Sequence, residues 1–317
     1  MEAISISFGD PTAQQSFAKE YAEFLLEYQS VMEATKAIML NRTINASIQD
    51  EADAVAHLAD DDPLVLAVED KYKANIASFI LARLAIDEFS EMLGLASNGY
   101  GLGALKILRS MYEKVVTSAY VAKHPEVSRA LVDSTWTHKW SLWKRLRKVN
   151  PTAEFGVDPS LIADLESKAA DAQSRLNESI CTKCKQIISV HSWTKVTLLT
   201  MAEKVGTSLS DLYAAAYQVP TSVAHATGES VNSKMEHTVD GSWTYRMDSS
   251  REMEHALCAG HNLMLQVLGR QNEQFGYGLE DLLAPRLEAY KRIWSSRDST
   301  VGAPAAELEA SRCIERE

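Results

Sequence analysis

An unbroken helical pattern runs from residue 64 to residue 97, and it is the feature that most constrains the fold of this 317-residue chain. Between Ile76 and Ile86 almost every position is apolar, with Arg83 as the charged exception. The pattern therefore predicts a long helix whose centre crosses a hydrophobic core. Glycine and proline contribute only 14 and 8 residues, and this scarcity favours long helices over a turn-rich β-sandwich or barrel.

The spacing typical of helices continues through most of the chain. A second strong helix is expected over 104–123, and residues 237–248 are expected to form a loop or a short strand pair. Further helices are predicted at about 125–149, 159–189, 197–205, 209–218, 249–269 and 278–295. We therefore predict an all-α fold, a single irregular bundle of about nine to eleven helices with few or no strands. One domain is expected over residues 1–297, and residues 298–317 are expected to be a disordered tail.

Composition limits the class of protein. The hydrophobic share of 46% is ample for a packed core. No stretch approaches the roughly 18 apolar residues that a membrane span needs, and the first residues lack the basic and apolar regions of a secretory signal. Four cysteines are too few for a disulfide framework. We expect a cytoplasmic protein with no membrane partner, and a homodimer because two-fold assemblies are common.

The net charge of −11 conceals an uneven distribution. The segment 99–150 carries +7, whereas the rest of the chain carries −18. Overall acidity argues against a protein that binds duplex DNA, which requires a clustered basic surface. Aromatic residues interleaved with bases can nevertheless bind single-stranded nucleic acid, so RNA is a candidate partner. The residues that would bind it are Trp140, Lys144, Arg145, Arg147 and Lys148. The alternative is that the tryptophans belong to the core and the bases form a solvated face.

Two groups of polar residues are candidates for a site. Arg109 and Glu113 lie one turn apart at the border of the apolar stripe of the helix 104–123. They could form an intrahelical ion pair, or they could line a pocket as a half-buried pair.

The second group consists of Tyr217, Ser222, His225 and Glu229. Pro220 is expected at a helix start, so that Ser222, His225 and Glu229 share one face of that helix. A histidine can act as acid or base near neutral pH, and a serine beside it could be a nucleophile. The alternative is that these side chains are hydrogen-bonded core residues.

Two weaker motifs favour structural roles. Cys181, Cys184, Cys258 and His261 would be a permissible zinc set, but packing as small apolar residues is the favoured interpretation. We therefore predict no metal and no cofactor.

The run Gly99-x-Gly101-x-Gly103 resembles a phosphate loop but lacks a preceding strand. It is expected to be a turn between two helices.

The polar positions resemble those of a bacterial family, domain-of-unknown-function family 5677. The run Leu108-Arg109-Ser110-Met111-Tyr112-Glu113 is similar to its Arg-Ser-x2-Glu helix, and the run Tyr217-x4-Ser222-x2-His225 to its second block. The resemblance covers about residues 60–270. It implies an all-helical fold and a shared site, but no known activity. The residues of that site are Arg109, Glu113, Tyr217, Ser222 and His225.

Helical proteins of the HEPN type, many of them ribonucleases in phage defence or toxin systems, are a natural comparison. Their hallmark is Arg-x4–6-His on one helix. No histidine follows Arg109 at that spacing, so a similar active site requires Arg109 and His225 to meet in the fold.

Two functions follow. In a metal-independent ribonuclease or related defence or toxin protein, Arg109 would bind phosphate, His225 would be the acid or base, and Glu113 would orient one of them. In a non-catalytic helical module that binds a ligand or a protein, the same residues would form a structural hydrogen-bond network. If Arg109, Glu113 and His225 converge in an open pocket, the ribonuclease is favoured. If they form a sealed hydrogen-bond network, the binding module is favoured.

Overall fold

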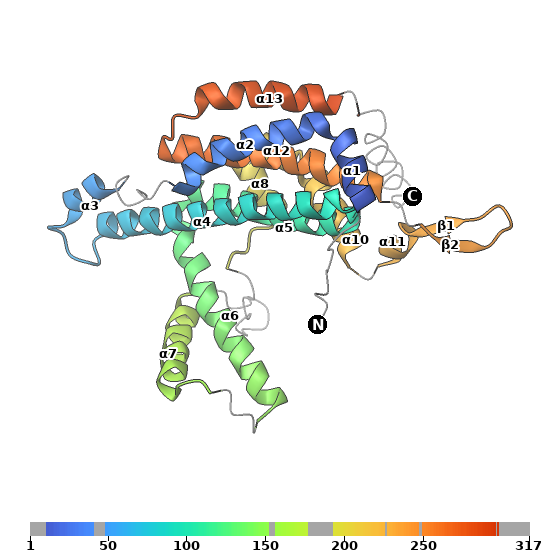
Figure 1. Ribbon diagram of the computed structural model, residues 1–317. Coiled ribbons are helices and arrows are strands. Elements are labelled where there is room, and N and C mark those ends of the chain that lie inside the picture. The colour runs from blue at the N-terminus through green and yellow to red at the C-terminus, as the bar shows by residue number, and fades with distance from the viewer. Residues whose placement is uncertain are drawn as a thin grey trace, which may run out of the picture. The chain divides into compact units, whose positions relative to one another are not determined.

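The computed structural model of the chain describes residues 11–40, 48–151, 156–176, 193–225, 227–246, 249–295 and 297. In these residues two short strands accompany a series of helices (Figure 1), so the prediction of an all-α fold is confirmed. The predicted tail, 298–317, lies outside the described residues.

The chain divides into two compact units. The first comprises Met1–Ile44, Phe79–Ala119 and Ala202–Glu317, and the second comprises Asn45–Ser78 and Tyr120–Met201. The single-domain arrangement stays a prediction, and the two units are described separately.

The first unit is organised around helix α12 (Ser250–Phe275), which has a long series of buried residues on its apolar side. Helices α2 (Ala22–Leu40) and α13 (Glu280–Ser295) pack on α12 and on each other (Figure 1). The other helices that contribute to this unit are α1 (Pro11–Glu20), α4 (Pro63–Ser97), α5 (Gly101–Lys123), α8 (Leu198–Val205), α9 (Thr207–Ser210), a π-helical segment (Ala214–Gln218), α10 (Val219–Ala224) and α11 (Gly228–Asn232). Strands β1 (Met235–His237) and β2 (Trp243–Tyr245) form an antiparallel hairpin.

Side chains of α4 reach α12 in the core of this unit. Phe89 and Met92 of α4 are fully buried, and a Cβ atom at Gly260 of α12 would overlap the Met92 side chain. The expected long helix is confirmed, but its centre is not buried all round, because Ile80 and Leu84 expose 49% and 43% of their surface.

The chain turns between α4 and α5 at Gly99, as predicted, whereas Gly101 and Gly103 already belong to α5. Gly99 has a φ of 79°, which glycine adopts without steric cost. The backbone N–H of Gly101 donates to Ser249 Oγ at 3.1 Å, and that hydroxyl donates to the carbonyl of Gly99 at 2.6 Å. A Cβ atom at Gly101 would collide with the Ser249 backbone, so the glycines permit close approach to the start of α12.

The second unit contains α6 (Ser128–Val149) and α7 (Pro159–Leu176), which pack side by side (Figure 1). It also contains α3 (Gln49–Val55), the first part of α4, and a short 3-10 turn over Pro125–Val127. The predicted continuation of α7 beyond residue 176 lies outside the described residues.

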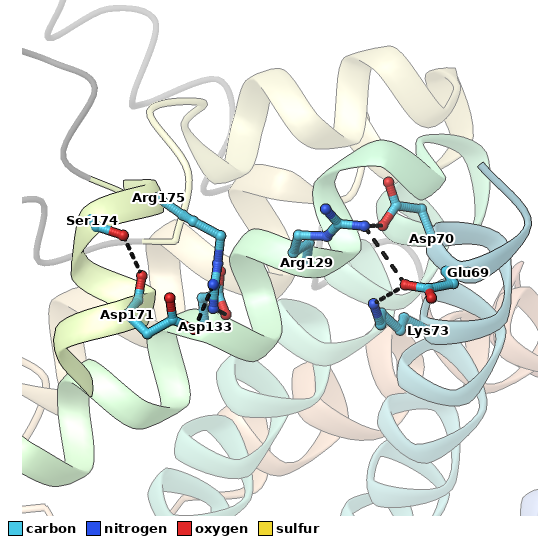
Figure 2. A network of polar contacts seen from close by, with 8 residues as sticks. All are labelled: Glu69, Asp70, Lys73, Arg129, Asp133, Asp171, Ser174 and Arg175. Atoms are coloured by element: carbon cyan, nitrogen blue, oxygen red, sulfur yellow. Dashed lines mark hydrogen bonds and ion pairs between the residues drawn. The ribbon is translucent and has the colours of Figure 1, made fainter. Parts of the chain in front are cut away.

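Ion pairs tie the helices of this unit together (Figure 2). Arg175 of α7 donates from Nε and Nη2 to the two carboxylate oxygens of Asp133 on α6, both at 2.8 Å. Arg175 also contacts Asp171 within α7 at 2.7 Å. Towards the other end of α6, Arg129 lies 3.2 Å from Asp70 of α4. Buried Asp133 therefore has a two-point partner on the neighbouring helix.

We expect Asp133→Ala to lower the free energy of unfolding by about 2 kcal/mol, because it removes charge-assisted hydrogen bonds between two helices. Asp171→Ala is the matched control. Its carboxylate is exposed and its ion pair lies within one helix, so a loss of about 0.5 kcal/mol or less is expected. Urea denaturation of both variants tests the difference, and equal losses would contradict it.

A buried histidine is part of the core of the first unit. Trp294 Nε1 donates to His261 Nδ1 at 3.1 Å, and the rings of Phe24 and Tyr290 pack against the same imidazole. Burial lowers the pKa of His261 to about 4, because a buried imidazolium would lose its hydration.

The fold should therefore lose stability in mild acid. Unfolded His261 binds a proton near pH 6.5, whereas the folded residue binds one near pH 4. The contribution of His261 to the free energy of unfolding is therefore complete above pH 6.5 and is lost as the pH falls towards 4. The loss amounts to about 3 kcal/mol. His261→Gln retains an acceptor for Trp294 and should show a weaker pH dependence in denaturant titrations between pH 7 and 4. The same dependence in both proteins would refute this role.

Candidate functional site

Helix α5 positions the first half of the site. Tyr112 is fully buried and donates from its hydroxyl to the carbonyl of Leu209 at 2.8 Å. Burial strongly raises the pKa of Tyr112, so the phenol remains a donor. Arg109 lies one turn earlier, and its side chain is 25% exposed, which agrees with the predicted border position.

The segment after α9 positions the second half. The π-helical segment contains Tyr217 and leads directly into α10, where Pro220 occupies a starting position as predicted. Helix α10 ends at Ala224, however, and His225 has extended backbone angles of φ −96° and ψ 161°. The expectation that Ser222 and His225 share one face of a continuing helix is therefore wrong.

Helix α10 ends here because a side chain beyond it forms a hydrogen bond with one of its last carbonyl groups. Thr227 donates from Oγ1 to the carbonyl of Ser222 at 2.5 Å. The same hydroxyl accepts from the backbone N–H of Ser230 at 3.2 Å and so caps α11. His225 is consequently turned out of the helix and is exposed.

The two predicted groups meet at Arg109. Its Nη1 lies 3.0 Å from His225 Nε2, and its Nη2 lies 3.3 Å from Glu113 Oε1. The guanidinium carbon also lies 5.3 Å from the centre of the Tyr217 ring, within the range of a cation–π contact. Because an arginine can only donate, this contact requires Nε2 of His225 to accept, which places a ring proton on Nδ1.

Ser222 does not join this cluster. Its hydroxyl donates to the carbonyl of Val219 at 2.8 Å, within its own helix. This geometry offers no hydrogen bond between Ser222 and His225 that would make the serine a nucleophile.

A cavity of about 590 Å³ adjoins the cluster on the His225 side. Lys106 of α5 and Lys234 line it, together with Trp243 and Tyr245 of the hairpin, and no described acidic residue lines it. Sequence reasoning did not assign these residues to a site. The alternation Trp243-Thr244-Tyr245 is the signal that could have indicated an aromatic face.

The basic, tryptophan-bearing residues lie on α6 in the second unit. Trp140 is half-buried, whereas Lys144, Arg145, Arg147 and Lys148 are exposed. Lys144 Nζ lies 5.8 Å from the centre of the Trp140 ring. Trp140, Lys144 and Arg145 also line a cavity of about 610 Å³ between α6 and α7. The tryptophan is thus accessible at the surface of its unit.

The two described members of the possible zinc set, Cys258 and His261, do not form a metal site. His261 accepts from Trp294, and Cys258 Sγ lies 3.5 Å from the Tyr290 hydroxyl. Cys181 and Cys184 lie outside the described residues. Within the described ranges, no group of three or more histidine, cysteine or acidic side chains could hold a metal ion.

In the part of the chain that the structure describes, no helix combines the length and the apolar composition that a membrane span requires.

The fold is all-α and brings Arg109, His225 and Glu113 into contact. The chain belongs to a family of unknown function, DUF5677, whose model matches residues 75–242. Searches of curated proteins and of solved structures find no match. The matched range contains all the site residues that the sequence predicts: Arg109, Glu113, Tyr217, Ser222 and His225.

The contact between Arg109 and His225 predicts a defined tautomer. Nitrogen-15 NMR of the free protein should show the His225 tautomer with its proton on Nδ1, because Nε2 accepts from the guanidinium. Arg109→Ala should release this constraint, whereas Ser222→Ala should leave the tautomer unchanged. A proton on Nε2 in the wild type would contradict the arrangement.

Proposed function

We propose that this chain is a metal-independent ribonuclease with Arg109 and His225 at its active site. The observation that carries the proposal is their contact at 3.0 Å beside an open cavity. Residues 116 positions apart supply a phosphate-binding group and an acid–base group at one place. The pair thus meets through the fold, as the comparison with HEPN-type ribonucleases requires.

In the proposed reaction, a phosphodiester of RNA binds to Arg109. Its oxygens accept from the guanidinium in place of His225, which frees Nε2. Nε2 then removes the proton of the 2′-hydroxyl while the 2′-oxygen forms a bond to phosphorus. The bond to the 5′-oxygen breaks, and that oxygen takes a proton from water. The products are a cyclic 2′,3′-phosphate and a 5′-hydroxyl, and the imidazolium returns its proton to solvent.

Glu113 and Tyr217 would act as positioning residues. The carboxylate holds Nη2 of Arg109 at 3.3 Å, and the Tyr217 ring lies 5.3 Å from the guanidinium carbon. Together they would restrict the rotamers of Arg109 before the phosphate binds, which reduces the entropy lost on binding.

We propose that the basic face of α6 binds the RNA strand. Its lysines and arginines are exposed and would neutralise phosphates, and the accessible Trp140 offers a ring for a base. An enzyme of this kind in the cytoplasm would suit a defence or toxin role.

The second candidate is a binding module without catalysis. Arg109 already contacts His225, Glu113 and Tyr217, which favours a preformed anion-binding site. The exposure of His225 argues against a purely structural network.

Cleavage of a labelled RNA in the presence of a metal chelator tests the proposal. His225→Ala should reduce the rate by at least about 100-fold, because general acid–base catalysis contributes 10²–10⁴-fold. Arg109→Ala should lower it by a similar factor. Ser222→Ala is the control and should retain the wild-type rate.

The melting temperature of His225→Ala should remain close to that of the wild type, since His225 is exposed. Absence of cleavage by the wild type would refute the ribonuclease. If Arg109→Ala then also abolished the binding of an RNA oligomer, the module would be supported.

A further inference from the structure

We infer that the β1–β2 hairpin stacks an unpaired base of single-stranded RNA beside the phosphate held at Arg109. The position of that phosphate rests on the proposed function. The stacking surface rests on other residues, which contact neither Arg109 nor Glu113 in any described interaction, and it can therefore be tested separately.

The register of the hairpin collects aromatic side chains on one face. Tyr245 pairs with Met235, and Trp243 pairs with His237. Paired residues project to the same side of a sheet, as do alternate residues of one strand. All four therefore share a face, whereas Glu236 and Thr244 form the intervening pair.

Both large aromatic rings of this face are accessible. Trp243 exposes 63% of its surface and Tyr245 exposes 62%. The imidazole of His237 meets the Trp243 ring edge-on, with ring centres 4.7 Å apart, which restricts the indole. Exposed rings that neighbouring side chains already hold in place form a stacking platform at low entropic cost.

Two lysines line the cavity beside this platform. Lys234 Nζ lies 5.9 Å from the centre of the Tyr245 ring, although only 8% of the residue is exposed. Across the cavity, Lys106 lies one turn before Arg109 on α5, is exposed, and has no ion pair with any described residue. His225 completes this side of the cavity.

The exposed aromatic rings and the lysines together indicate the chemical class of the ligand. A nucleotide in a single strand offers a flat ring for stacking and a phosphate for Lys106 and Arg109. In a duplex the bases are already stacked and paired, so the same contacts would require unpairing. An apolar protein surface would desolvate Lys106 and Lys234 without supplying an opposite charge.

The test measures the binding of a labelled 2′-O-methyl RNA oligomer by fluorescence anisotropy. This probe lacks the attacking hydroxyl, so binding is measured without cleavage. Trp243→Ala and Tyr245→Ala should each weaken binding by about 5- to 150-fold, and Trp243→Phe should restore most of the affinity. Tyr100→Ala is the matched control, because Tyr100 is 59% exposed and does not line the cavity.

Lys106→Ala should reduce the slope of log affinity against log salt by about 0.7, the value for one phosphate contact on a single strand. A duplex of the same sequence should bind more weakly than the single strand. A DNA oligomer of that sequence shows how far the sugar contributes to binding.

The inference is overturned if the wild type binds no oligomer, if it prefers the duplex, or if the hairpin variants lose no more affinity than Tyr100→Ala. It is also overturned if Trp243→Ala disrupts self-association in sedimentation experiments while RNA binding is unchanged. Loss of affinity in the hairpin variants, without cleavage of ordinary RNA by the wild type, would support the stacking surface and refute the ribonuclease. Cleavage of ordinary RNA that Trp243→Ala leaves unchanged at low RNA concentration would support the ribonuclease and refute the stacking surface.

Discussion

The buried hydrogen bond from Tyr112 to the carbonyl of Leu209 is the contact on which the site depends. It joins α5 to a segment 97 residues later in the chain. Burial keeps the phenol protonated, so the bond does not respond to physiological pH. Arg109 is one turn away on the same helix, and the joined segment continues to His225. The arginine and the histidine therefore meet because Tyr112 fixes the register between their two elements.

The charges around this contact reconcile a chain of net charge −11 with the anionic ligand that we propose. The cavity beside His225 is lined by Lys106 and Lys234, and no described carboxylate lines it. Glu113 reaches Arg109 at 3.3 Å and has a side chain that is 44% exposed. An open cavity lined by lysines within an acidic protein concentrates anions locally, whereas the acidic remainder disfavours extended contact with a polyanion. Such a distribution favours short, flexible strands over long duplexes.

Local periodicity was sufficient to predict most of the fold. The long helix α4, the glycine turn and the Arg109–Glu113 pair all follow from spacings of a few residues. The exit of the chain from α10 could not be predicted, because it depends on Thr227 reaching the Ser222 carbonyl rather than on helix propensity. The meeting of Arg109 with His225 likewise depends on tertiary packing, and the family resemblance proposed a common site without giving its geometry.

The π-helical segment gives a physical reason why the site forms at this point of the chain. Pro220 has no N–H and cannot complete the hydrogen bond of a regular helix at its position. The preceding Ala214–Gln218 segment has a wider π turn, and such turns are frequent at functional sites. The ring centre of Tyr217 is 6.1 Å from that of buried Tyr112 and 5.3 Å from the Arg109 guanidinium carbon. Tyr217 therefore connects the buried contact with the accessible cation, and a regular α-helix would turn its ring to another direction.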